Sequence, residues 1–247
     1  MRQLKFYIIL SVLFGYQATF AQTTTPVDHF DKAIISPHVQ VTFVEGNEES
    51  VTIENNTAGS DKLKIEVNNR TLRIYLYGAK EVTKNAKAYD NGYKEKQPLY
   101  NGTVVTAIVT YKTLDNLSIR GEETIVCKSP LKGDRFKLKI YGESDVILNE
   151  VHLGELQTTL YGESLLEIKS GDIKNQRYTA YGESRVNSLG INGNTSRITS
   201  YGESDFKLNV ADAIKITSYG DANLNYQGNP VITKGLHIGD VHIDKID

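Results

Sequence analysis

The chain has 247 residues, of which 28 are basic and 30 acidic, so its formal net charge is −2. A surface without excess positive charge does not attract nucleic acid or anionic lipid, and the sequence therefore predicts neither as a partner. The single cysteine, Cys127, has no second cysteine with which to form an internal disulfide, so the fold must rest on packing alone.

The N-terminus has the three parts of an export signal. Arg2 and Lys5 supply positive charge, an apolar run follows from Phe6 to Phe14, and small residues lead up to Ala21. We expect a signal peptide over residues 1–21. The apolar run is too short to span a bilayer comfortably, so no membrane span is expected after cleavage. The mature protein is then exported, to the periplasm, the cell surface or the extracellular space.

Residues 22–113 are expected to form a β-rich N-terminal portion. Apolar and polar residues alternate at Val39–Phe43 and at Leu72–Leu76, which is typical of strands with one buried face. A lysine-rich polar stretch near residues 79–100 shows no such period. We interpret it as an exposed excursion with a helical turn around Glu81–Ala88.

A short motif recurs over residues 114–247. The tetrapeptide Tyr141-Gly142-Glu143-Ser144 returns at twenty-residue intervals, and a weaker copy, Tyr219-Gly220-Asp221-Ala222, follows after eighteen. Mostly apolar residues recur two and four positions before the glycine and four and six positions after it, which indicates alternating columns that face a common interior. Coils of about 18–21 residues without a helical pattern predict an all-β fold, a parallel β-helix (solenoid), in which glycine marks each corner.

The recurring tyrosines are the candidate binding residues. Their parity is outward and next to the corner, so we expect one continuous tyrosine stripe on the surface. The tyrosine stripe consists of Tyr141, Tyr161, Tyr181, Tyr201 and Tyr219. A row of aromatic rings suits sugar rings or a partner strand, and any partner is expected on the stripe or on the acidic column beside it. The alternative is a self-stacking ladder, in which each ring shields and stabilises its neighbour.

The acidic column lies two positions after the tyrosines. It consists of Glu122, Glu143, Glu163, Glu183, Glu203, Asp221 and Asp240. Stacked carboxylates about 5 Å apart suit Ca²⁺, which makes four of them candidate metal ligands. These four are Glu143, Glu163, Glu183 and Glu203. The alternative is a solvated corner whose side chains fan out into water, where salt screens their charges.

No catalytic residue and no cofactor is predicted. Ser144 and its counterparts have inward parity and form a hydroxyl ladder in this interpretation, since repetition argues against one privileged nucleophile. The Gly-x-Ser-x-Gly motif is absent, as are the phosphate-binding, dinucleotide and zinc signatures. Cys127 has inward parity, which favours a buried inert thiol.

The chain resembles a known family, the putative auto-transporter adhesin, head GIN domain family of Bacteroidota and other bacteria. The resemblance rests on the opening Phe30-Asp31-Lys32-Ala33-Ile34, on the glycine-centred coils, and on a Tyr-x-Gly-x-Pro signature at Tyr226, Gly228 and Pro230. It covers roughly residues 28–247 and implies a right-handed parallel β-helix in an exported or surface protein. The corners depart from the family's usual Gly-Ser-Gly, because Gly-Glu-Ser stands there.

The leading interpretation is a non-enzymatic, adhesin-like extracytoplasmic module that binds an envelope protein or a glycan. One alternative is a carbohydrate-active enzyme on a β-helix scaffold, which needs acids and a base clustered on one face rather than a uniform column. Another is a structural protein of cell-envelope assembly. Fold analogy alone does not choose among the three.

The export signal generates the first prediction. Cleavage after Ala21 leaves Gln22 as the first residue of the protein recovered from the cell envelope. N-terminal sequencing of envelope material checks this, and a chain that still begins at Met1 contradicts it.

Overall fold

The structure, a computed structural model, describes residues 23–90 and 93–247, and the expected signal peptide lies outside them. Within these residues there are strands and no helix, which confirms the all-β prediction. The first part of the chain holds β1 (Thr23–Pro26), β2 (Lys32–Ile35), β3 (Val39–Glu45), β4 (Ser50–Asn56), β5 (Leu63–Asn68), β6 (Thr71–Leu76), β7 (Asn85–Asp90), β8 (Tyr93–Pro98) and β9 (Val105–Tyr111). The repeat region holds β10 (Asn116–Gly121), β11 (Ile125–Cys127), β12 (Leu131–Gly142), β13 (Asp145–Leu148), β14 (Val151–Tyr161), β15 (Leu165–Ile168), β16 (Gly171–Tyr181), β17 (Ser184–Tyr201), β18 (Ser204–Tyr219), β19 (Ala222–Gln227), β20 (Val231–Ile238) and β21 (Val241–Lys245).

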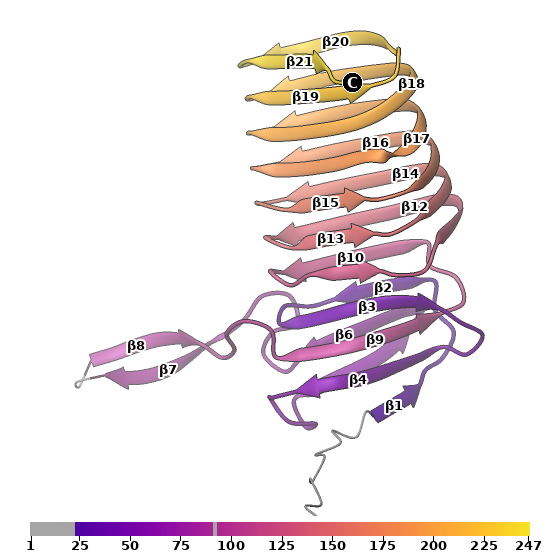
Figure 1. Ribbon diagram of the computed structural model, residues 1–247. Helices are drawn as coiled ribbons and strands as arrows, with labels where there is room; N and C mark the ends of the chain where they lie inside the picture. The colour runs from indigo at the N-terminus through magenta and orange to yellow at the C-terminus, as the bar shows by residue number, and fades with distance from the viewer. Residues whose placement is uncertain (1–22, 91–92) are drawn as a thin grey trace, which may run out of the picture.

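The repeat region forms the expected parallel β-helix of about six turns (Figure 1). Long strands stack on one side, where β12 pairs with β14 and β14 with β16, all in parallel. Shorter strands stack on the other side, where β11 pairs with β13 and β13 with β15. The register advances by one repeat at each step, so Ile140 lies beside Leu160 and Leu160 beside Ala180.

The inward columns predicted from the repeat are buried. Four positions after the glycine, the side chains from the first corner to the fifth are at most 2% exposed. These are Ile125, Val146, Leu166, Val186 and Phe206. Burying a side chain of this size contributes about 2 kcal/mol relative to leaving it in water. The last coil is less completely covered: Ile243, four positions after Gly239, is only half-buried, and Val231, Leu236 and Ile238, which are not in the inward columns, are 64–71% exposed.

The stack continues into the N-terminal part of the chain. Strands β2 and β3 pair in parallel with β10 and β11, and β6 and β9 pair in parallel with β2 and β3. Two further layers therefore come from residues that precede the repeats. Antiparallel strands β4 and β5 pair with β9 and β6, and β1 pairs with β4, so these strands cover the lower end of the stack in Figure 1.

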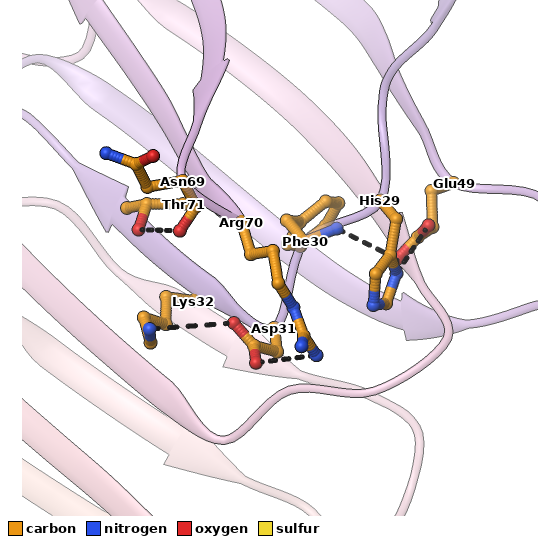
Figure 2. Close-up of polar contacts among 8 residues, drawn as sticks. All are labelled: His29, Phe30, Asp31, Lys32, Glu49, Asn69, Arg70 and Thr71. Atoms are coloured by element: carbon orange, nitrogen blue, oxygen red, sulfur yellow. Dashed lines mark hydrogen bonds and ion pairs between the residues drawn. The ribbon is translucent and has the colours of Figure 1, made fainter.

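The Phe30-Asp31 opening is fixed by buried acids, as Figure 2 shows. The Phe30 ring is fully buried, and its backbone N–H donates to Oε1 of Glu49 at 3.3 Å. His29 Nδ1 lies 3.0 Å from the same carboxylate. Asp31 pairs with Arg70 at 2.8 Å. The Phe30-Asp31 opening, which resembles the family motif, thus anchors the chain directly before β2.

The polar stretch near residues 79–100 was expected to contain a helical turn around Glu81–Ala88, and this is wrong. Strands β7 and β8 form an antiparallel hairpin instead, which projects from the side of the stack (Figure 1). The sequence between the two strands is Asn91-Gly92, a pair that favours two-residue hairpin connections. Pairing between the two strands, rather than helix propensity, decides the conformation here.

The recurring glycines are the corners of the coil, as predicted. From Gly121 to Gly239 the seven corner glycines have φ between +99° and +131°, which side chains with a Cβ rarely adopt. The corners also touch: a Cβ on Gly202 would lie 2.9 Å from the carbonyl oxygen of Gly182. Glycine is therefore required both for the bend and for the close approach of successive coils.

Gly182→Val tests the corner. The φ of Gly182 is +102°, and a Cβ added there would lie 3.1 Å from the Gly162 carbonyl oxygen, so both the bend and the space oppose a branched side chain. We expect a loss of about 3 kcal/mol of unfolding free energy, measured as a lower thermal midpoint. Gly102→Ala is the control, because φ there is +58° and a Cβ would meet no atom of the described residues within 4 Å; its expected cost is about 1 kcal/mol. Equal midpoints for Gly182→Val and the wild-type protein would contradict the corner's role.

Candidate functional site: the tyrosine and acidic face

The tyrosine stripe exists as one continuous column on the outside of the corner. In-register pairing of the long strands places each tyrosine beside its counterpart in the next coil. Successive rings are stacked, with centroids 4.7–5.0 Å apart and planes within 3–7° of parallel. Tyr161, Tyr181, Tyr201 and Tyr219 are each 37–40% exposed. The predicted stripe and the predicted self-stacking ladder are therefore the same object.

Stacking limits what the stripe offers to a ligand. Rings at most 5.0 Å apart leave no room for a sugar ring between them, so the inner faces are occupied by neighbouring tyrosines. At the first end of the ladder the Arg120 guanidinium lies 5.3 Å from the centroid of the Tyr141 ring. The stripe thus presents ring edges and phenol oxygens to a partner, rather than the open ring faces that sugars stack on.

The serine ladder consists of Ser144, Ser164, Ser184 and Ser204, each of which directly follows an acid of the column in the sequence and is buried. Each hydroxyl donates to the carbonyl of the corner glycine one coil earlier, from Ser144 to Gly121 at 2.8 Å and from Ser164 to Gly142 at 2.9 Å. Ser184 and Ser204 repeat the contact at 3.2 and 3.4 Å. These hydroxyls satisfy backbone groups at a bend where regular strand pairing ends, so their role is structural, as predicted.

The acidic column is exposed along its length. Its second half borders a groove of about 610 Å³. Six carboxylates line this acidic groove, namely Glu163, Glu183, Glu203, Asp205, Asp221 and Asp240. Arg185 and His242 are the basic side chains in the same lining. The groove is therefore a negatively charged surface parallel to the tyrosine stripe.

Three or more His, Cys, Asp or Glu side chains are nowhere gathered into a group that could hold a metal ion within residues 23–90 and 93–247. The acids of the column point outward from successive corners and do not converge. The prediction from the sequence is a solvated corner without a metal site, and Ca²⁺ binding by Glu143, Glu163, Glu183 and Glu203 is its alternative; both stay untested.

A second hollow, which sequence reasoning missed, lies where the N-terminal layers meet the first corner. This junction pocket measures about 500 Å³ and is lined by Pro37 and His38, by Glu81–Thr83, by Arg120–Glu123 and by Tyr141. The available signal was the degenerate first copy of the motif. In that copy Arg120 replaces the tyrosine and Glu123 the serine, while the glycine and the outward acid are kept.

Glu123 is the most unusual acid of this pocket, because it is only 6% exposed. Burial raises the pKa of its carboxyl group above the usual value, against the opposing effect of a hydrogen bond from the backbone N–H of Glu122. That N–H donates to Oε2 at 3.1 Å. Arg120, which lines the same pocket as Glu123, forms an ion pair with Glu81 on the loop that follows β6.

Cys127 is fully buried in the core, and burial raises the pKa of its thiol to about 12. A thiol in this state is not a nucleophile at neutral pH, in agreement with the prediction of an inert residue.

There is no apolar helix of membrane-spanning length in the part of the chain that the structure describes.

Comparison with known proteins adds a family. The family model described as putative auto-transporter adhesin, head GIN domain, matches residues 29–230. No curated protein matches the sequence. A crystal structure of a putative adhesin from Bacteroides fragilis aligns with a TM-score of 0.75 at 17% identity, over 92% of this chain and 96% of that one.

Two further structures from the genus Parabacteroides have the same fold. A putative adhesin from Parabacteroides merdae aligns with a TM-score of 0.66 at 16% identity, over 92% of this chain and 96% of that one. A protein named as a putative lipid binding protein, from Parabacteroides distasonis, aligns with a TM-score of 0.63 at 18% identity, over 93% and 98% of the two chains. At these identities the likeness establishes the fold alone.

The stacked rings generate a stability prediction. Changing Tyr161 and Tyr181 together to serine removes three ring contacts. We expect a loss of about 3 kcal/mol, because a stacked aromatic pair contributes about 1 kcal/mol beyond its buried area. Tyr77→Ser is the control, since Tyr77 is 67% exposed and lies outside the ladder. Thermal melting that places the double variant level with Tyr77→Ser would show that stacking does not stabilise the coil.

Proposed function

Because this chain belongs to the putative auto-transporter adhesin, head GIN domain family, we propose that it is an extracytoplasmic, adhesin-like binding module without catalytic activity. Its partner docks on the face formed by the tyrosine stripe and the acidic groove. The partner is a protein segment rich in lysine or arginine. The observation that carries the proposal is the acidic groove itself, in which six carboxylates line one hollow beside four stacked ring pairs.

Charge selects the class of partner. Exposed carboxylates stacked at the coil spacing repel one another, and a positively charged segment relieves this repulsion on binding. An anionic polysaccharide carries the same sign of charge as the groove and would be repelled by its carboxylates, so it is disfavoured. A neutral glycan lacks open ring faces to stack on, because the tyrosines stack on each other. A basic protein segment meets both constraints.

The tyrosines add contact area without much loss of freedom. Their rings are held in place by the neighbouring rings and by in-register strands, so little side-chain entropy remains to be lost on binding. The ring edges lie next to the acids, because tyrosine and acid are two positions apart across each glycine corner. Aliphatic stems of lysine or arginine can therefore lie against the rings while the charged ends reach the carboxylates.

The charge of the groove is the testable part of the proposal. The probe is a peptide of alternating lysine and serine, whose binding is measured by calorimetry at low and at physiological salt. We expect the triple variant Glu163→Gln, Glu183→Gln, Glu203→Gln to bind it at least about tenfold more weakly, and the wild-type affinity to fall with salt. The matched control changes three exposed acids outside the groove, as Glu45→Gln, Glu48→Gln, Asp134→Asn. Equal weakening by both triple variants would contradict a specific groove.

The folded fraction of the Tyr161→Ser, Tyr181→Ser variant separates the two roles of the stripe. A binding stripe predicts that this variant loses peptide affinity even where circular dichroism shows it folded. Unchanged affinity in the folded variant would restrict the tyrosines to stabilising the coil and leave the acidic groove as the docking surface.

A further inference from the structure

The first corner of the β-helix breaks the repeat, and the break creates the junction pocket. In the tyrosine column Arg120 lies beside Tyr141, and in the serine column Glu123 takes the place that serine holds in the next four corners. Both substitutions face one hollow of about 500 Å³. The last corners also depart from the repeat, but with the apolar residues Ala222, Ile238 and Val241. Only the first corner introduces charged side chains in these two columns, which points to a role beyond closing the coil.

Glu123 lines this pocket, and its carboxylate accepts hydrogen bonds from backbone N–H groups, those of Glu122 and His38, rather than from a side-chain donor. Oε2 accepts the Glu122 backbone N–H at 3.1 Å. Oε1 lies 3.9 Å from Nδ1 of His38. That nitrogen donates its proton to the carbonyl of Gly102 at 2.7 Å, and Nε2 lies 2.6 Å from the Thr83 hydroxyl. Both ring nitrogens of His38 are therefore engaged elsewhere.

The arginines nearby are engaged as well. Arg73 and Arg120 both pair with Glu81, and Arg73 also donates to the backbone carbonyl of Lys80 at 2.8 Å. The Arg120 guanidinium lies over the Tyr141 ring. Glu81 compensates one of these two positive charges, and neither guanidinium lies within ion-pair distance of Glu123, so among the described residues the carboxylate of Glu123 has no lysine or arginine partner. A buried charge in this state is costly until a counterion reaches it.

The walls of the pocket suit an alkyl chain. Pro37 lies on the side of the β2–β3 turn, the Val82 side chain is 74% exposed on the loop that follows β6, and the ring of Tyr141 borders the opposite side. An apolar stem can pass between these groups and bring a charged end to Glu123. The lining also contains Glu122 and Glu81, so an anionic group is disfavoured.

We propose that the junction pocket binds a primary ammonium group on an alkyl stem, the end of a lysine side chain from the basic partner, with Glu123 as its counterion. An ammonium is a point charge that one carboxylate oxygen can hold, whereas a guanidinium makes its best contact with two oxygens at once. Oε2 is already occupied by a backbone N–H, so the pocket selects lysine over arginine. The identity of the ligand as part of a protein rests on the proposed function; the preference for an alkylammonium rests on the pocket alone.

A purely structural role for Glu123 is the alternative, and two variants separate it from binding. Glu123→Gln keeps the shape and removes the charge. Glu123→Ser installs the residue found at this position in the next four corners, so it is compatible with the coil. Glu143→Gln is the matched control, because it removes one exposed acid of the same face and leaves the pocket intact.

The experiment is an NMR titration of the mature protein with Nα-acetyl-lysine amide, followed through the backbone amides of Gly121, Glu122 and Thr83. We expect saturable shifts at these amides in the wild-type protein and in Glu143→Gln. The affinity is expected to fall at least about tenfold in Glu123→Gln and in Glu123→Ser, the loss of roughly one favourable charge pair. Two further probes are Nα-acetyl-norleucine amide, which has a similar stem without the ammonium, and Nα-acetyl-arginine amide. Both should bind more weakly than the lysine probe, the norleucine amide by at least about tenfold.

Several outcomes overturn the inference. It is wrong if the lysine probe shifts none of these amides, if Glu123→Gln and Glu123→Ser bind it as the wild-type protein does, or if the norleucine or arginine probe binds as tightly. Failure of the proposed function looks different: the lysine–serine peptide then binds the groove triple variant and the wild-type protein equally, while the single lysine probe still depends on Glu123.

Discussion

In-register parallel hydrogen bonding between successive coils is the constraint on which this structure depends. It places each residue directly beside its counterpart one repeat earlier, so that a column in the sequence becomes a column in space. The register is held at the corner, where glycine adopts a positive φ that residues with a Cβ rarely adopt. There the serine hydroxyl reaches back to the preceding coil. A column that packs well then gains stability from every coil, and no coil needs to be stable alone.

The same constraint has a cost on the outer surface. Stacking is favourable for tyrosine, whose rings lie at 4.7–5.0 Å, but it brings carboxylates into repeated proximity. The corner tolerates the acids because they are exposed to solvent, where salt screens their charges. A favourable aromatic column thus lies beside an electrostatically strained one. The stacked tyrosines make this face stable, while the neighbouring carboxylates repel one another and attract positive charge. These two properties together are the physical basis of the proposed binding role.

The ends of a repeat stack differ from its middle, and here the first end carries the less regular chemistry. Strands from the N-terminal part enter the stack below β10, so the first corner meets the Pro37-His38 turn instead of another Gly-Glu-Ser corner. At this corner the columns gain charged residues: arginine takes the place of tyrosine and glutamate that of serine. Individual side chains there are free to depart from the repeat, and so the junction pocket has a composition that no other corner repeats.

The sequence by itself determined the coil, its corners and its columns, because a period of about twenty residues with glycine at a fixed place admits few alternatives to a parallel β-helix. It also determined that Ser144 and its counterparts face inward and that the tyrosines face outward, since parity along a strand is a local property. Other features depended on the tertiary structure. Strands β2, β3, β6 and β9 join the stack out of chain order, and alternation of apolar residues does not say which strands pair. The hairpin of β7 and β8 replaced an expected helical turn, because strand pairing outweighed local propensity. His38, Glu81 and Glu123 are far apart in the chain and meet only once those layers are stacked, so their pocket was decided by the fold.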